Sequence, residues 1–244
     1  MKISFTSFRI FLPKLFPIVI VLLVSGCTLE RCENLLKADF NAATPGADPD
    51  FELAGDPDGD KIWYSRESGP ELKISADKQL NYKSAAGNWP QYLSFYPKSV
   101  VIDQPIYYYW NATPSISGMP LIVFFGDGHF GAFGGIKYDM DGKVKIRASA
   151  TDDDYVNLGS YTNGSPHTIW IRYDPTARTY RVKIVPASGA TIDSGERPLI
   201  GTIPTGSTYP AIYFRYPNED ERFKEAKESQ YKIKFMYVNK KEPK

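Results

Sequence analysis

Short stretches in which apolar and polar residues alternate recur along the chain from about residue 36 onward. Alternation with a period of two is typical of strands that have one face in a core and the other in water. The stretches 168–174 and 179–185 are clear examples, and Asp174-Pro175 begins the turn that joins them. In chain order the pattern predicts strands over 36–40, 61–65, 71–75, 79–83, 92–96, 106–111, 121–125, 133–139, 143–148, 155–161, 168–174, 179–185, 198–202, 211–216 and 231–239.

This density of short strands, without any long helical periodicity, predicts an all-β fold made of two antiparallel sheets packed as a sandwich. One polar stretch, 219–229, has acidic residues towards its start and lysines later, the order that a helix dipole favours. We therefore expect one short surface helix near the C-terminus. No linker divides the region 36–244, so it is predicted to be a single domain.

The first 26 residues differ from the rest of the chain. Lys2, Arg9 and Lys14 precede the apolar run 15–24, and no acidic residue lies among them. A membrane span needs roughly 20 apolar residues, so this run is too short to be a permanent anchor. The pattern predicts an export signal peptide over residues 1–26.

The signal ends in Leu-Val-Ser-Gly followed by Cys27, which resembles the bacterial lipobox. The resemblance implies that Cys27 becomes the lipid-modified first residue of the mature protein. It also implies a membrane-anchored protein of the cell envelope, and Thr28 is compatible with the outer membrane. The alternative is an ordinary signal peptide with a cysteine there by chance. We expect residues 27–35 to form a lipidated tether.

Charge and cysteine content follow from this division. Removal of the signal leaves 26 basic against 28 acidic residues, a net charge of about −2, so we expect no nucleic-acid partner. Lipidation of Cys27 would leave Cys32 as the one other cysteine, which excludes an intramolecular disulfide. Stability must then come from the core.

Three segments suggest a family. The stretches 35–41 (LLKADFN), 167–185 (HTIWIRYDPTARTYRVKIV) and 231–239 (YKIKFMYVN) resemble the concanavalin A-like lectin and glucanase sandwich, a jelly roll that laminin G modules share. The resemblance implies neighbouring N- and C-terminal strands, which would seat the domain close to its tether. This fold carries lectins, hydrolases, lyases and structural modules, so it names no single function.

The catalytic signatures of these relatives are missing. Retaining glucanases of this fold carry a Glu-x-Asp-x-x-Glu pattern on one strand, whereas the nearest spacing here, Asp139 and Asp141, falls in a predicted turn. Related lyases end in Tyr-Phe-Lys-Ala-Gly-x-Tyr, and the last strand departs from this at the glycine. His129, with Asp127 in the same glycine-rich loop, remains a weak catalytic candidate. His167 is expected to be a structural hydrogen-bond partner.

One motif could hold a metal ion. Asp56, Asp58 and Asp60 alternate around Gly59, so their carboxylates could surround a structural calcium ion. The motif lacks the later glutamate of a full calcium-binding loop, and aspartates also populate turns for backbone reasons. No other cofactor is expected.

Aromatic residues supply the candidate ligand contacts. Trp110, Tyr108, Trp89 and Trp63 are candidates for stacking against sugar rings, with core packing as the alternative for each. The leading hypothesis is a lipid-anchored envelope protein whose non-catalytic sandwich binds a polysaccharide. The alternatives are a carbohydrate-active hydrolase or lyase with an atypical site, and a structural or assembly lipoprotein of the envelope.

Overall fold

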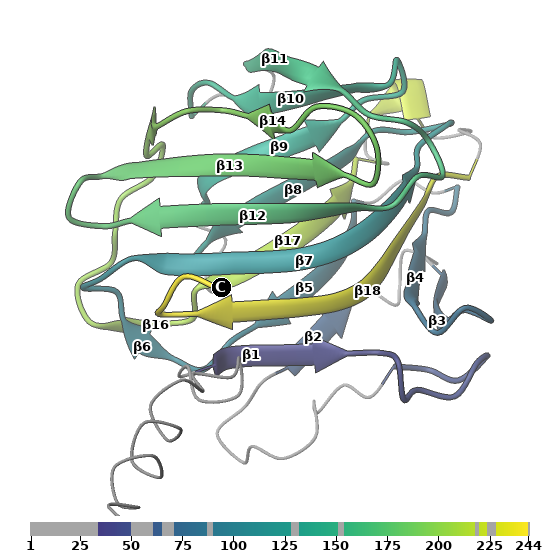
Figure 1. Ribbon diagram of the computed structural model, residues 1–244, viewed down its shortest axis with the longest axis horizontal. Coiled ribbons are helices and arrows are strands. Elements are labelled where there is room, and N and C mark those ends of the chain that lie inside the picture. The colour runs from purple at the N-terminus through teal and green to yellow at the C-terminus, as the bar shows by residue number, and fades with distance from the viewer. Residues whose placement is uncertain are drawn as a thin grey trace, which may run out of the picture.

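The computed structural model describes residues 34–49, 61–64, 71–86, 90–127, 132–150, 154–217, 220–223 and 228–243. These residues form two antiparallel sheets packed face to face (Figure 1). The side chains of both inner faces fill the space between the sheets. The predicted all-β sandwich is therefore confirmed. No helix in these ranges is long and apolar enough to cross a membrane.

Sheet A contains nine strands of the described residues. Its strands run in the order β14 (Ile192–Asp193), β13 (Thr179–Pro186), β12 (His167–Asp174), β7 (Ile106–Ser115), β18 (Gln230–Asn239), β4 (Leu80–Lys83) and β3 (Glu71–Ile74). Two further strands join it, β1 (Asn34–Asp39) beside β18 and β15 (Arg197–Pro198) beside β13.

Within the described part of the chain, sheet B contains seven strands. Their order is β11 (Tyr155–Ser160), β10 (Lys143–Arg147), β9 (Ala132–Tyr138), β8 (Leu121–Gly126), β17 (Ala211–Tyr216), β5 (Gln91–Tyr96) and β2 (Lys61–Tyr64). Strands β6 (Val100–Val101) and β16 (Ser207–Thr208) pair with each other and form a separate two-stranded ribbon.

The alternation read from the sequence decides which residues fill the core. Along β7, burial alternates at every position, with each even-numbered residue inside. The inner faces of the two sheets meet in one apolar cluster that is rich in aromatic rings. Tyr82 stacks on Tyr216 of the opposite sheet with ring centroids 4.8 Å apart, and Phe125 contacts Tyr180 at 5.1 Å.

The N- and C-terminal strands are neighbours, as the family resemblance implied. Strand β1 pairs with β18, with Lys37 opposite Tyr237. The strand begins at Asn34, and Leu35 is buried, so the last two residues of the predicted tether belong to the sheet. A tether that begins at Cys27 would therefore end before Asn34, two residues earlier than the sequence pattern indicated.

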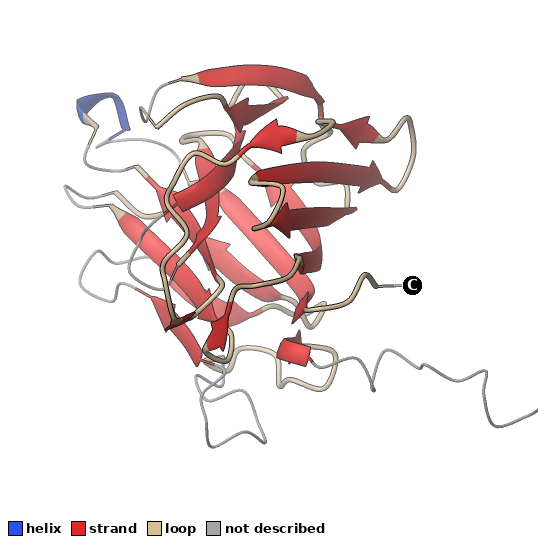
Figure 2. Cartoon of the chain, turned by 90° about the vertical axis from the view of Figure 1, so that its left-hand side faces the viewer, coloured by secondary structure: helices blue, strands red, loops and turns tan. Residues whose placement is uncertain are grey.

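The predicted helix over 219–229 is wrong for the part of this segment that the structure describes. That part contains a single 3₁₀ turn, Glu221–Phe223 (Figure 2). Asp220 accepts a hydrogen bond from the backbone N of Arg222 at 2.9 Å, and Phe223 is buried. A nearly all-polar stretch with one apolar anchor has no stripe to pack against the sheets, so packing cannot stabilise a longer helix.

Candidate functional site

Two of the predicted stacking residues lie in the core. Tyr108 and Trp110 have no exposed surface, because the even-numbered face of β7 points towards sheet B. The Nε1 of Trp110 donates a hydrogen bond of 3.0 Å to the Oη of Tyr231, and its ring meets the edge of Phe214. The structure therefore overturns the prediction that these two rings bind a ligand.

Apart from Asp127, the side chains of the other predicted site residues are not placed. Trp63 is described through its backbone alone, which pairs with Ser94 of β5. Outside the described residues lie Cys27, Asp56, Asp58, Asp60, Trp89 and His129. Within the described ranges, no group of three or more histidine, cysteine or acidic residues is arranged to hold a metal ion. The calcium site remains a prediction.

The outer face of sheet B carries a pocket of about 320 Å³ that the sequence did not indicate. Five strands and two loops contribute to it. Its lining consists of Tyr92, Phe124, Ala132, Arg147, Ala150, Ile200, Gly201, Tyr213 and Arg215.

Strand register gathers these side chains. Along β17, Ile212 and Phe214 point into the core, so Tyr213 and Arg215 point outward. Arg215 pairs with Tyr92 of β5, and its guanidinium carbon lies 5.9 Å from the centroid of that ring. On the other side, Tyr213 pairs with Phe124 of β8. The pairing thus places an aromatic ring and a cation on adjacent strands.

Arg147 reaches the same pocket from β10. Its neighbour Ile146 pairs with Ile136, which puts Arg147 beside Gly135 of β9. Because Gly135 has no side chain, Arg147 can extend across β9 to Phe124, where its guanidinium carbon lies 5.3 Å from the ring centroid. Its Nη2 donates a hydrogen bond of 2.6 Å to the carbonyl of Ala150. The side chain of Arg147 is almost buried.

A loop closes one side of the pocket. The backbone N of Ile200 donates a hydrogen bond of 2.9 Å to the carbonyl of Phe133. A Cβ at Gly201 would lie 2.5 Å from the carbonyl oxygen of Ala132, which is closer than real contacts allow. The loop can therefore approach β9 this closely only with glycine at position 201.

The pocket and its surroundings are rich in basic side chains. The nine lining residues include two arginines and no acid. On the same face, Lys137 of β9 lies opposite Lys145 of β10 in the strand register. The Nζ atoms of Lys137 and Lys145 lie 3.5 and 2.6 Å from Oδ2 of Asp139. Burial opposes ionisation of Asp139, but the two lysines hold its pKa below the usual value.

One weak catalytic candidate lies beside the pocket. The Oη of Tyr213 donates a hydrogen bond to the backbone carbonyl of Asp127, at the start of the loop that contains His129. His167, by contrast, is buried between the sheets, where its Nε2 lies 2.8 Å from the Oη of Tyr138. Burial lowers its pKa to about 4, so it is neutral at pH 7. This supports the expected structural role of His167.

The pocket is suited to bind a ligand that combines flat apolar faces with polar edges. Aromatic rings and stacked guanidiniums offer planar surfaces, while arginine N–H groups can bind hydroxyl, carboxylate or phosphate oxygens, the last two in bidentate fashion. The sequence alone did not indicate the five large side chains of the pocket, which are Tyr92, Phe124, Arg147, Tyr213 and Arg215. The alternation in 143–147 puts Arg147 on the polar side of its strand, but no local pattern shows that it meets Tyr213 and Arg215.

No family model matches the sequence, and no curated protein matches it. Solved structures do resemble it. The marine PL-14 alginate lyase from Aplysia kurodai superposes with a TM-score of 0.55 at 7% identity, over 84% of this chain and 98% of that chain. The lectin UEA-II complexed with galactose gives a TM-score of 0.53 at 7% identity, over 84% and 98%.

A sialidase also resembles the chain, with a TM-score of 0.54 at 11% identity over 80% of this chain. The match covers 18% of the sialidase, so the chain spans less than a fifth of that protein's length. At such identities the likeness shows the fold alone. The chain therefore has the concanavalin A-like jelly-roll fold that lectins and alginate lyases also have.

Proposed function

We propose that this protein is a lipid-anchored envelope protein that binds a glycan in the pocket on the outer face of sheet B. One observation carries the binding proposal: Phe124 and Tyr92 each lie under an arginine guanidinium, Arg147 and Arg215, in one concave site. Aromatic rings stack on the apolar faces of sugars, and the arginines bind their oxygens. The lectin and lyase folds of the structural neighbours agree with this chemistry.

The lining charges favour a glycan that bears acidic groups. Arg147 and Arg215 stand three strands apart, on β10 and β17, which corresponds to roughly 14 Å between their backbones at the usual strand spacing. Both side chains line the same pocket, so a sugar carboxylate bound there would meet a bidentate donor. Uronic-acid polysaccharides have this combination of flat rings and carboxylates.

Anchoring is the second part of the proposal and rests on the sequence. The signal pattern and the lipobox at Cys27 favour export and lipid modification. Strand β1 begins seven residues after Cys27, so the sandwich would stay close to the membrane. The likeness to the lipobox and the composition of the leader support this part.

Titration calorimetry of the mature lipidated protein in detergent tests the binding proposal. The ligand panel pairs oligomers of galacturonate, mannuronate, guluronate and hyaluronan with their methyl-esterified forms, and adds neutral oligomers of glucose, mannose and xylose. We expect at least one acidic oligomer to bind about tenfold more tightly than its ester, a difference of about 1.4 kcal/mol. If acids and their esters bind with equal affinity, the preference for acidic glycans is refuted but glycan binding is not. If no oligomer of the panel binds, the glycan proposal itself is refuted.

A second candidate function is cleavage of the bound glycan. Tyr213 lines the pocket together with Arg215, and a tyrosine can act as a general acid or base. Its Oη donates a hydrogen bond to the carbonyl of Asp127, two residues before His129. To test this, the acidic oligomers are incubated with the protein and then assayed for new reducing ends and for the ultraviolet absorbance of unsaturated uronates. Product that disappears in His129→Ala and Tyr213→Phe would establish catalysis, and no product from any bound oligomer would exclude it.

A further inference from the structure

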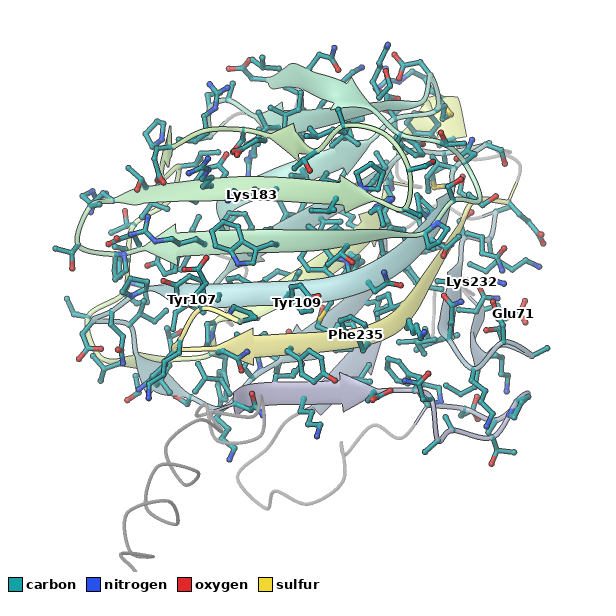
Figure 3. The ribbon with its side chains drawn as sticks, in the orientation of Figure 1. Glu71, Tyr107, Tyr109, Lys183, Lys232 and Phe235 are labelled. Carbon is teal, nitrogen blue, oxygen red and sulfur yellow. The ribbon has the colours of Figure 1, made fainter. Side chains whose placement is uncertain are left out.

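The outer face of sheet A carries a second concentration of aromatic side chains, on the side of the sandwich opposite the pocket. Figure 3 shows Tyr107, Tyr109 and Phe235 on this face, which is turned towards the viewer. We call the following five half-buried residues the aromatic face: Tyr107, Tyr109, Trp170, Phe235 and Tyr237.

Strand register arranges part of the aromatic face as a row across the sheet. Trp170 pairs with Tyr109, and Tyr109 pairs with Tyr237. The row ends in a lysine on each side, because Trp170 also pairs with Lys183 and Tyr237 also pairs with Lys37. Three aromatic rings therefore lie between two ammonium groups on five neighbouring strands.

The rings form two groups, each held together by ring contacts. Tyr109 stacks on Phe235 with ring centroids 5.5 Å apart, and Phe235 contacts Tyr237 at 5.3 Å. At the other end, Tyr107 lies 6.0 Å from Trp170. Among the described residues no ring contact joins these two groups, but the backbone pairing of Trp170 with Tyr109 sets them side by side on the sheet, so a partner lying on this face would meet both.

The two terminal lysines differ from several other cations of this sheet, which are paired with acidic residues. Arg181 is paired with Asp193 at 2.6 Å, and Lys232 with Asp77 at 3.3 Å. Lys183 instead places its Nζ 5.0 Å from the centroid of the Trp170 ring. Among the described residues neither Lys183 nor Lys37 has an ion-pair partner within 4 Å, although Lys183 lies opposite Asp193 in the register and helps to lower the pKa of that carboxyl. With no direct ion pair, both ammonium groups can still bind an external anion.

The lipid tether ends next to this surface. Lys37 and its partner Tyr237 lie at the β1 edge of the aromatic face, and β1 begins at Asn34. Seven residues separate Asn34 from Cys27, so a lipid at Cys27 lies at most about 25 Å from the start of the strand. A bilayer that holds the lipid is thereby kept at high local concentration near the aromatic face.

We propose that the aromatic face docks on the surface of the anionic phospholipid bilayer that holds the lipid anchor. The inference rests on the proposed lipidation of Cys27. Tyrosine and tryptophan rings have an apolar body and a polar edge, which suits them to the headgroup region. Lys37 and Lys183 pair with lipid phosphates at the two ends of the row. Since the two sheets lie back to back, docking through sheet A turns the sheet B pocket away from the membrane.

Surface labelling of the unmodified protein tests the docking. The mature lipidated protein is reconstituted into vesicles of phosphatidylethanolamine and phosphatidylglycerol, labelled with a membrane-impermeant amine reagent, and compared with the same protein in detergent by peptide mass spectrometry. We expect labelling of Lys37 and Lys183 to fall roughly fivefold on the vesicles, because bound lipid excludes the reagent. Lys143, on the outer face of sheet B, is the internal control and should label equally in both states.

The outcomes separate this inference from the proposed function. Protein that fails to float with the vesicles would refute lipidation, and with it the docking. Protein that floats while Lys37 and Lys183 stay fully reactive would refute the docking and leave the anchor intact. Protection that depends on protein concentration without vesicles would show contact between copies of the chain and would also overturn the proposal. Glycan titration reports on the pocket independently of all three.

A charge-reversed variant provides a second measurement. Lys37→Glu combined with Lys183→Glu should restore oxidation of Trp170 by hydroxyl radicals on anionic vesicles to roughly the level seen in detergent, since two attractive contacts become repulsive. Lys143→Glu is the matched control and should leave Trp170 protected. Trp170 that remains equally protected in the double variant would contradict the role of the two lysines.

Discussion

Arg147 places its guanidinium carbon 5.3 Å from the centroid of the Phe124 ring, although β9 separates the strands that carry them. Gly135 makes this contact possible, because it is the residue of β9 over which the arginine passes. A Cβ at Gly135 would lie 3.0 Å from Cδ1 of Phe124. The floor of the pocket thus depends on a residue that contributes no side chain to it.

Phe124→Leu should weaken glycan binding about tenfold, because it removes both the ring that a sugar would stack on and the platform that holds Arg147. Calorimetric titration with the best oligomer measures the effect. Phe235→Leu is the matched control, since Phe235 is also half-buried and on the outer face of the opposite sheet. Equal affinity in both variants would place the glycan elsewhere.

Tyr231→Phe should lower the free energy of unfolding by about 1–3 kcal/mol, because it leaves the buried Nε1 of Trp110 without its 3.0 Å acceptor. Denaturation in guanidinium chloride measures this change. The double variant with Trp110→Phe should show a coupling between the two residues. Glycan affinity should stay unchanged in Tyr231→Phe, and a large loss of affinity without a loss of stability would argue against a purely structural role for Trp110.

The stability of the protein should fall between pH 6.5 and pH 4 because of His167. Its pKa is about 4 in the folded state and about 6.5 when unfolded, so only the unfolded chain takes up a proton in this window. The free energy of unfolding therefore decreases as the pH falls, by roughly 3 kcal/mol in total, and the contribution of His167 is constant above pH 6.5.

Denaturation curves at pH 7 and pH 4.5 measure this dependence. Asp193 and Asp220 have pKa values of about 2, because Arg181 and Arg222 bind their carboxylates, so both titrate below the window. His167→Gln keeps a side chain that can bond to Tyr138 and should remove most of the slope. The same slope in wild type and variant would assign it to another group.

Cys27→Ala should abolish labelling by a fatty-acid probe during growth, because the thiol that accepts the lipid is gone. Cys32→Ala is the matched control and should be labelled like the wild type. Gel fluorescence of whole cells provides the readout. Continued labelling of Cys27→Ala would show that the cysteine is not the lipidation site.

The sequence predicted the strands better than it predicted the site. Local alternation identified the 167–185 hairpin and the final strand, since side chains on a strand alternate whatever lies around them. In the described part of 219–229 the predicted helix is replaced by a 3₁₀ turn, because helix formation there depends on packing that a polar segment lacks. None of the pocket residues stood out, because Tyr92 and Arg215 meet through pairing of β5 with β17, more than 120 positions apart in the chain.

The sequence by itself determined which residues share a face. In β7 it separated Tyr107 and Tyr109 from Tyr108 and Trp110, because the backbone of a strand turns successive side chains to opposite sides. Only the tertiary structure decided which of these faces is inside. Sheet B covers the side that carries Trp110, and burial follows from which face the second sheet covers, a long-range property that no local pattern contains.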